Sequence, residues 1–528
     1  VQITAMTRQI RRSAVAVAAV GCIGLGALAA PSIKESVSKL IAGTSMEETL
    51  NREVDMGDAF MVANTRPAKT TDPNAQNVFD GDDSTVWTAP ATKDAILQID
   101  LEKAQTINNI ILKEDGSNVR KYRIDAWNGE KWVKVYSNDL IEKYHLAVVD
   151  PMKTNAIRLV IENSENPASI KEVEVVHQRP VELDNRFINM AYMTGCSYVH
   201  SWDPIEPKKM DTFTDLTLIG NWAFDKDGNF VVIKEVYGPG GFDHAMEPTS
   251  KEAEEEMAKW LKNVDSYMGD NKVNVWMSLT CLKETKNADG SPANGVAGGR
   301  TAAFKNDAVR EKFVNDLMAY VQKYDFYGVD IDWEYPVSAD EWAAYDLLVK
   351  DLSAALHADG RYISTAQSRG TGLSKETFAK FDRINIMAYD NYSTMQNHST
   401  FSWCADDILK YFINTLGIDR SKIVLGLPWY AVDKNSITNQ TDWKAIYGLL
   451  SADNEEGDIT IDEGINTTRQ WGFNGPNLLR DKVVYAIKNR VGGVFVWQIK
   501  NDFEYDHPYS LARVMHEAIE EYTYVKAK

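Results

Sequence analysis

Cysteine is scarce in this chain, with four in 528 residues. Cys22 lies in an apolar segment near the N-terminal end, and the other three, Cys196, Cys281 and Cys404, are far apart and form no CxxC pair. An odd number of scattered thiols excludes a disulfide framework. We therefore expect these three cysteines to be buried, unpaired thiols.

Basic residues are also few relative to acidic ones: 57 Lys and Arg stand against 76 Asp and Glu, for a net charge of −19. Binding to nucleic-acid phosphates needs clustered Lys and Arg, so nucleic acid is excluded as a partner. Neutral sugars are compatible with this charge. The 14 Trp and 23 Tyr can supply the aromatic faces on which sugar rings stack, although most aromatic side chains fill cores.

An apolar run of small residues, 14–30, follows Arg8, Arg11 and Arg12, and A-L-A at 27–29 resembles a signal-peptidase site. The run is shorter than the roughly 20 residues that cross a bilayer. We expect residues 1–30 to be a signal peptide, which predicts a secreted or cell-surface protein. An uncleaved membrane anchor or lipidation of Cys22 are the alternatives, and either would confine membrane contact to this segment. Residues 31–58 are predicted to be a linker.

Residues 59–180 alternate short apolar runs with turn signals such as D-G-S and N-G-E. This pattern is typical of an all-β sandwich. The predicted strands are 95–101, 107–112, 122–127, 131–136, 156–161 and 171–176.

The loop F-D-G-D-D-S-T-V-W at 79–87 resembles that of the discoidin-like (coagulation factor type C) sandwiches, which include family 32 carbohydrate-binding modules. That resemblance implies a structural calcium bound by Asp80, Asp82, Thr85 and Glu172, which offer the hard oxygen ligands that calcium requires. The alternative is a plain Asx turn without metal. Whether the sandwich binds sugar or serves as a spacer stays open.

From residue 184 to 524 apolar strands alternate with helical stretches, which predicts a (β/α)8 TIM barrel after the sandwich. Catalytic groups of such barrels lie at the carboxyl ends of the strands. The eight predicted strands are 187–192, 216–222, 273–279, 327–333, 362–366, 383–389, 423–428 and 493–497.

The fourth predicted strand contains Y-G-V-D-I-D-W-E-Y-P at 327–336. Alternation places Asp330, Asp332 and Glu334 on one face of the strand, with apolar side chains on the other. Crowded carboxyl groups cannot all ionise freely, so one of them should retain a proton near neutral pH, as a general acid must. A calcium loop or a solvated edge strand would not alternate its acids with Val, Ile and Trp.

G-V-D-I-D-W-E-Y-P resembles the D-x-x-D-x-D-x-E strand of glycoside hydrolase family 18, the chitinases and endo-β-N-acetylglucosaminidases. Three further landmarks, M-A-Y-D at 387–390, G-L-P-W-Y at 426–430 and Trp497, fall in order on the predicted strands. The resemblance implies a retaining mechanism in which the substrate's own acetamido group is the nucleophile. It also implies no cofactor for catalysis.

The resemblance also implies roles for individual residues. Glu334 would be the acid and base, Asp332 would orient the acetamido group with Asp330 as its partner, and Tyr389 would donate to the acetamido oxygen. Substrate contacts would come from Asp390, Trp497, Tyr430 and Met387. Packing is the alternative for Met387, Tyr389 and Trp497, and Tyr430 is divided between substrate contact and structure.

The function expected from the resemblance is cleavage of β-1,4 bonds in N-acetylglucosamine-containing glycans, in the manner of a chitinase, by a monomer. One alternative is an endo-β-N-acetylglucosaminidase that cuts the chitobiose core of N-glycans, and another is a non-catalytic lectin. Three departures stand out. Tyr327 replaces the motif's first acid, Thr280 and Cys281 replace glycines on the third strand, and only 67 positions separate Tyr430 from Trp497, which predicts a shallow cleft without a large α+β insertion.

Overall fold

A computed structural model covers the chain, and residues 58–528 form one compact unit. The structure describes residues 60–61, 74–194, 205–220, 222–224, 229–232, 234–237, 244–247, 251–268, 272–279, 304–336, 338–393, 397–453, 463–468 and 470–526. The predicted leader and linker, and Cys196, Thr280 and Cys281, lie outside these ranges. Within them, no helix combines the length and apolarity needed to cross a membrane. Cys404 is buried and unpaired, as expected.

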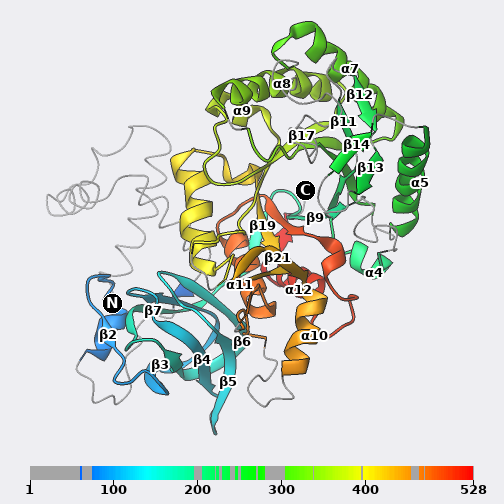
Figure 1. The fold of residues 1–528 in the computed structure, drawn as a ribbon. Coiled ribbons are helices and arrows are strands. Elements are labelled where there is room, and N and C mark those ends of the chain that lie inside the picture. Colours follow the sequence, from blue (N-terminus) through cyan, green and yellow to red (C-terminus); the bar gives the residue numbers. More distant parts are fainter. Residues whose placement is uncertain are drawn as a thin grey trace, which may run out of the picture. The chain divides into compact units, whose positions relative to one another are not determined.

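Eight parallel strands close into a barrel, which confirms the predicted TIM-barrel fold (Figure 1). Each predicted strand is present, although three end earlier than expected: β10 stops at Ile219, β16 at Ile331 and β18 at Ile386. In order around the barrel the strands are β10 (Asp215–Ile219), β15 (Asn274–Leu279), β16 (Gly328–Ile331), β17 (Tyr362–Gln367), β18 (Arg383–Ile386), β19 (Ile423–Pro428), β23 (Gly493–Trp497) and β9 (Ile188–Thr194).

Helices between the strands cover the barrel, and their start signals are local. Asn306, Ser338 and Ser374 each cap a helix by accepting a backbone N–H from the residue three positions on. The helices are α4 (Pro207–Met210), α5 (Lys251–Tyr267), α7 (Asp307–Lys323), α8 (Ala339–Ala358), α9 (Lys375–Lys380), α10 (Trp443–Asp453), α11 (Pro476–Lys488) and α12 (Leu511–Tyr522). Shorter turns are η5 (Trp403–Leu409), η6 (Tyr411–Thr415), η7 (Arg420–Lys422) and η9 (Ile499–Asn501).

Alternation along β16 sorts its side chains as predicted. Val329, Ile331 and Trp333 join the large apolar core that the helices share with the outside of the barrel. Asp330 lies on the opposite, interior face and is fully buried. The strand therefore delivers its acids to the inside and carboxyl end of the barrel, with Asp332 and Glu334 just beyond its last residue.

The amino-terminal end of the barrel is closed by a polar and aromatic cluster. Asp215 Oδ1 accepts hydrogen bonds from Trp276 Nε1 (2.9 Å), Asn274 Nδ2 (3.0 Å) and Arg383 Nη1 (2.8 Å). Tyr327 stacks on Tyr362 there, with ring centroids 4.6 Å apart. Tyr327, which replaces the motif's first acid, thus packs among aromatic rings and is not among the hydrogen-bond partners of Asp330.

Between β19 and β23, where no large α+β insertion was expected, the chain forms a small α+β element. It consists of the three-stranded sheet β21-β20-β22 and helix α10. Short strands suffice for it: β20 is Tyr430–Asp433, β21 is Ser436–Asp442 and β22 is Trp471–Gly472. Two further hairpins, β11 (Trp222–Phe224) with β12 (Phe230–Val232) and β13 (Lys234–Tyr237) with β14 (His244–Glu247), follow β10.

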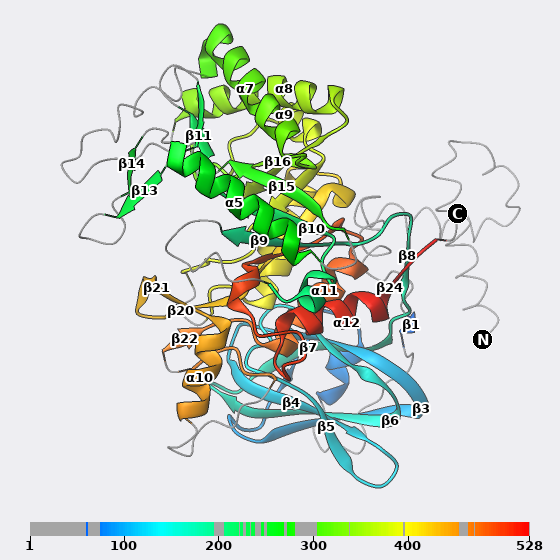
Figure 2. The same ribbon diagram turned by 90° about the vertical axis from the view of Figure 1, so that its right-hand side faces the viewer.

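The N-terminal domain is an antiparallel, seven-stranded sheet around its own apolar core, and the predicted all-β fold is confirmed (Figure 2). The predicted strands 95–101 and 107–112 are halves of one strand, because L-E-K-A-Q-T between them contains no turn residue and continues extended through register shifts. The elements are β1 (Phe60–Met61), η2 (Ala75–Phe79), β2 (Trp87–Thr88), β3 (Ala95–Glu114), β4 (Val119–Trp127), β5 (Trp132–Asn138), β6 (His145–Ser164) and β7 (Ser169–His177).

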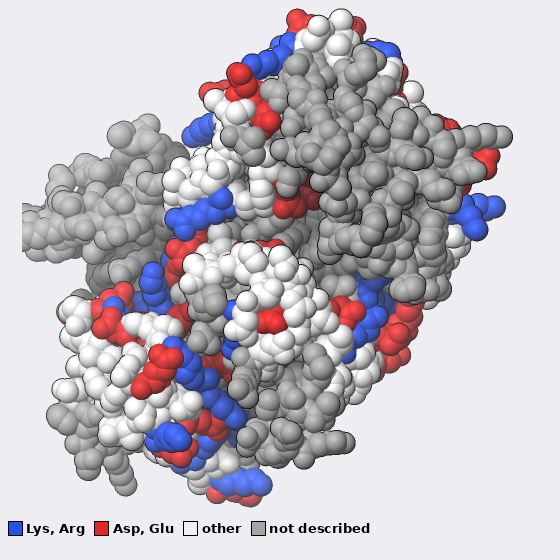
Figure 3. Space-filling model, viewed as in Figure 1, with Lys and Arg blue, Asp and Glu red and all other residues white. Residues whose placement is uncertain are grey.

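The sheet and the barrel share one buried interface. Leu146, Val148 and Val176 of the sheet belong to the same apolar core as the barrel helices. Asp481 of α11 accepts hydrogen bonds from the sheet, and strand β8 (Val181–Leu183) pairs with β24 (Thr523–Val525) at the end of the chain. On the face drawn in Figure 3, acidic and basic side chains are interspersed, with no broad area of one sign.

Candidate active site

Asp330 lies in the centre of the barrel and is held by four hydrogen-bond donors. Its Oδ1 accepts from Ser364 Oγ (2.6 Å) and Asn385 Nδ2 (3.1 Å), and its Oδ2 accepts from Ser278 Oγ (2.8 Å) and the Tyr192 hydroxyl (3.0 Å). Burial raises the pKa of Asp330, and these donors oppose that effect. A carboxyl group surrounded by donors is stabilised as the anion.

Asp332 has a different environment, although it is also buried. Its Oδ1 has no hydrogen-bond partner within the described part of the chain. Burial, and then the charges of Glu334 and Asp330, raise the pKa of Asp332 well above its ordinary value. The pKa of Asp330 is raised against four donors and that of Asp332 without any, so Asp332 is the better placed of the two to keep a proton.

Glu334 is the exposed member of the series, and its peptide bond to Tyr335 is cis. The three acids therefore run from a fully buried anion, through a buried proton carrier, to a group at the surface of the barrel end. This gradient places a carboxyl group that can exchange protons with solvent beside one that cannot. Such an arrangement suits general acid and base chemistry.

Asp390 follows strand β18 and is held by two neighbours. The Tyr430 hydroxyl donates to Asp390 Oδ1 (2.5 Å), and His398 Nδ1 lies 3.2 Å from the same oxygen. Although burial by itself would raise it, the hydrogen bonds from His398 and Tyr430 bring the pKa of Asp390 below its ordinary value. The side chain remains 38% exposed, so one part of this anion faces the open end of the barrel.

Met387, Tyr389 and Trp497 pack on a second apolar cluster inside the barrel, which contains Tyr192 and Phe495. The Trp497 ring lies 5.9 Å from that of Tyr192, and Tyr389 meets Tyr430 edge to face at 6.0 Å. The eight residues singled out for catalysis or substrate contact thus lie in or just after β16, β18 and β23, except Tyr430, which begins β20. The charges of Asp332 and Glu334 both act on Tyr389, so the tyrosine lies near these acids.

The site also contains residues that sequence reasoning missed. Register could have identified two of them, since Ser278 and Ser364 pair directly with Asp330 on the neighbouring strands β15 and β17. No local signal marks the others, because they reach the site from distant strands or loops. They are Tyr192, Asn385 and His398.

Residues 293–502 match the family model "Glycosyl hydrolases family 18". This part of the chain is thus similar to the family 18 glycosyl hydrolases. The match includes the acids of β16, Asp390 and Trp497, and it confirms the predicted resemblance. Residues 62–174 match the F5/8 type C domain, as the loop at 79–87 predicted.

The family 18 domain has many relatives. Chitinase 1 of Aphanocladium album is 27% identical over 37% of this chain, and probable chitinase 2 of Drosophila melanogaster is 23% identical over 37%. The chain spans 57% and 52% of these relatives' own lengths. Among solved structures, a chitinase from Bacteroides thetaiotaomicron covers 64% of this chain and 97% of its own, with a TM-score of 0.49 and 17% identity.

The loop predicted to bind calcium forms an Asx-type turn. Asp80 Oδ2 accepts from the Thr85 hydroxyl (2.8 Å), and Asp82 Oδ1 is engaged by Ser84. Glu172 Oε1 is buried and has no hydrogen-bond partner in the part of the chain that the structure describes, and burial followed by Asp80 raises the pKa of Glu172 to about 7.

No three His, Cys, Asp or Glu side chains gather as a metal-binding group in the described ranges. The calcium site of Asp80, Asp82, Thr85 and Glu172 stays a prediction, based on oxygens of the kind that a hard ion binds.

Proposed function

We propose that this chain hydrolyses β-1,4 bonds of N-acetylglucosamine-containing glycans, in the manner of a chitinase. One observation carries the proposal: Asp332 Oδ1 is a buried acceptor with no partner among the described residues, next to an acid that four donors hold. An unpaired buried acceptor costs about 1–3 kcal/mol, so a ligand that donates to it is bound selectively. The acetamido N–H of N-acetylglucosamine is such a donor.

Asp330 would stay negatively charged throughout, since its four donors stabilise that charge. Asp332 would hold a proton between Asp330 and Glu334, and its free oxygen would accept from the acetamido N–H. That contact fixes the acetamido group beside the anomeric carbon. Positioning of this kind replaces an intermolecular collision with an intramolecular attack.

Glu334 would act twice. As acid it gives its proton to the glycosidic oxygen, while the acetamido carbonyl oxygen bonds to the anomeric carbon and the leaving sugar departs with that proton. The product is a cyclic oxazolinium ion. As base, the Glu334 carboxylate then takes a proton from water, whose oxygen bonds to the same carbon and opens the ring, and the configuration is retained.

The surrounding residues would hold the reacting sugar. The Tyr389 hydroxyl would donate to the acetamido oxygen, and Trp497 would form the floor of the pocket. Asp390 and Tyr430 would contact the sugar beside the scissile bond, and Met387 would pack against it. The names of the fungal and insect relatives, both chitinases, support this substrate class.

The test incubates the full chain with chitin oligomers and, separately, with a high-mannose glycoprotein. Shortened oligomers with retained configuration are expected, and Glu334→Gln should abolish turnover while the affinity for the oligomer persists. Release of intact glycans without chitin cleavage would assign the chain to N-glycans instead. Sugar binding without turnover in the unaltered chain would overturn hydrolysis and favour a lectin.

We also propose that the chain is exported and acts as a monomer outside the cell. The run of small apolar residues after Arg12, with A-L-A at 27–29, supports export. N-terminal sequencing of the protein recovered from the medium is expected to begin after this run. Recovery of the uncut chain in the cytoplasm would contradict it.

A further inference from the structure

A short segment, residues 397–401, binds the backbone on both sides of Asp390; we call it the strap. The Ser399 hydroxyl donates to the Ala388 carbonyl oxygen (2.6 Å), and the Asn391 N–H donates to the His398 carbonyl oxygen (2.8 Å). The His398 ring contacts Asp390 itself. Its Nδ1 lies 3.2 Å from the backbone nitrogen of Asp390, and its Nε2 lies 3.3 Å from the Tyr430 carbonyl oxygen.

Asp390 needs such support because of its backbone. Its φ of +62° is in the left-handed region, which side-chain-bearing residues rarely adopt. Conformations of this kind persist only where the surroundings over-determine them. Three of the contacts that hold Asp390 in this conformation come from the strap.

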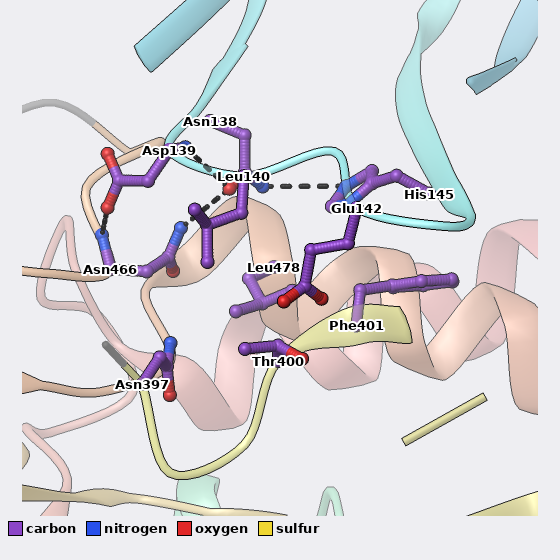
Figure 4. Close-up of a pocket in the computed structure, with 10 residues that line it drawn as sticks. All are labelled: Asn138, Asp139, Leu140, Glu142, His145, Asn397, Thr400, Phe401, Asn466 and Leu478. Carbon is purple, nitrogen blue, oxygen red and sulfur yellow. Dashed lines mark hydrogen bonds between the residues drawn. The ribbon is translucent and has the colours of Figure 1, made fainter. Parts of the chain in front are cut away.

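The other side of the strap is bound by the N-terminal sheet (Figure 4). The Glu142 carboxylate faces Thr400, whose hydroxyl opposes the rise that burial causes in the pKa of Glu142, and the Phe401 ring lies 4.8 Å from the His145 ring. In Figure 4 the carboxylate of Glu142 points toward Thr400 across a small cavity between the two domains.

A second connection runs through adjacent residues of α11. Asp481 accepts from the Tyr136 hydroxyl (2.5 Å) and the Val148 N–H (2.9 Å), both in the sheet. The next residue, Lys482, is buried and donates to the carbonyl oxygen and the hydroxyl of Ser399, each at 2.7 Å. The same turn of helix thus holds the sheet on one side and the strap on the other.

We propose that the N-terminal sheet is a positioning element of the active site: through the strap it holds Asp390 in the conformation that the reaction uses. The inference rests on the proposed function. It gives the sheet a role in turnover that does not depend on whether the sheet binds sugar.

The test compares three variants of the full chain on a chitin oligomer. Glu142→Ala removes the carboxylate that faces Thr400 and is expected to lower kcat about tenfold with a smaller change in KM, since small misplacements at a reacting centre cost up to about 100-fold. Glu142→Gln keeps an acceptor oxygen and should restore most of the rate. Asp150→Asn breaks an exposed pair with Arg480 at the same interface, away from the strap, and should leave kcat unchanged.

A double-mutant cycle makes the test specific. If Glu142 acts through the strap, its effect on kcat should largely vanish in a His398→Ala background, because coupled residues are not additive. Additive effects of the two substitutions, or an equal loss of kcat in Asp150→Asn, would overturn the inference. So would an unchanged kcat in Glu142→Ala.

The affinity of each variant for a thiazoline mimic of the cyclic intermediate, measured by calorimetry, gives a readout that is independent of turnover. Glu142→Ala is expected to weaken this binding by a factor similar to its loss in kcat. An unaltered chain that cleaves no oligomer contradicts the proposed function. An active chain whose Glu142→Ala variant matches it in rate and affinity contradicts only the role of the sheet.

Discussion

Asp330 and Asp332 are two positions apart, both are buried, and they differ in partners. Four donors surround Asp330, whereas Asp332 Oδ1 has none in the described ranges. The difference decides which carboxyl group carries charge and which carries a proton. The pair is thus a fixed anion beside a neutral group that is prepared for a ligand.

Replacing Asp332 by Asn is expected to stabilise the fold at neutral pH while it lowers kcat about 100-fold, the usual loss on removal of one preorganised polar group. The pKa of Asp332 is raised well above its ordinary value by burial and then by Glu334 and Asp330. The folded protein therefore binds this proton more tightly than the unfolded chain, whose Asp pKa is about 3.9. The stability that this proton contributes is fully present below about pH 4, and it is lost as the pH rises through the pKa of Asp332 in the folded protein.

The melting temperature of Asp332→Asn should consequently exceed that of the unaltered chain at pH 7, and the gap should close near pH 4. Scanning calorimetry at both pH values measures it. Asp340→Asn, at an exposed acid on α8, serves as the control and should show no such pH-dependent gain. An equal gap at both pH values would contradict the assignment of the proton to Asp332.

At the scale of elements, the two ends of the barrel differ in what they contribute. Catalytic candidates follow the carboxyl ends of the strands, and the Asp215 cluster ties β10, β15 and β18 together at the other end. Residues at that end of a TIM barrel serve stability. Asp215 is 1% exposed and Arg383 13%, so their ion pair is largely shielded from water.

Asp215→Ala is therefore expected to lower the free energy of unfolding by about 3–5 kcal/mol, because it leaves the Arg383 charge and two further donors unpaired. Activity per folded molecule should not change, since the cluster is at the opposite end of the strands. Urea unfolding measures the free energy of unfolding, and an active-site titration measures the activity per folded molecule. Asp316→Asn, in an exposed pair with Lys312, should cost less than about 1 kcal/mol. A loss of kcat in Asp215→Ala without a loss of stability would refute this division.

Calcium should raise the melting temperature of the chain if Asp80, Thr85 and Glu172 bind it. Glu172 Oε1, buried without a partner, would gain a ligand. Calorimetry in calcium and in a chelator measures the shift in melting temperature. Glu172→Gln should remove this shift, whereas Asp83→Asn, at an exposed acid of the same loop, should preserve it. Identical melting curves with and without calcium would leave a plain Asx turn.

The sequence predicted the individual strands better than the contacts between them. Apolar runs between turn signals located all eight barrel strands, and two-residue alternation placed Asp330 inside. The donors to Asp330 come from β9, β15, β17 and β18, and their approach depends on barrel closure and register, which local patterns do not encode. The division of β3 into two strands was wrong. The polar stretch between the two apolar runs was interpreted as a turn, although it contains no turn residue.

At the scale of the whole molecule, the two domains share one buried interface. Apolar side chains of the sheet enter the core of the barrel helices, and Asp481 adds hydrogen bonds to Tyr136, Val148 and His145. Elements with a common core unfold cooperatively. Domains joined only by a linker would melt independently.

The described domains are therefore expected to melt in one calorimetric transition in the unaltered chain. Asp481→Ala leaves several buried donors of the sheet unpaired, at about 1–3 kcal/mol each, and should divide that transition in two. Asp150→Asn, at the rim of the same interface, should keep it single. Two transitions in the unaltered chain would rule out a shared cooperative unit. A single transition of Asp481→Ala at the melting temperature of the unaltered chain would do the same.

Helix α11 also limits how the protein can be shortened. Almost all of its side chains are buried, with β23 on one side and β5 and β6 of the sheet on another. A recombinant chain cut down to the barrel would expose apolar surface along this helix, and exposed patches of that kind promote aggregation. Laboratories that trim the gene to its hydrolase portion should expect inclusion bodies, and protease digestion should leave the two domains joined as one resistant fragment.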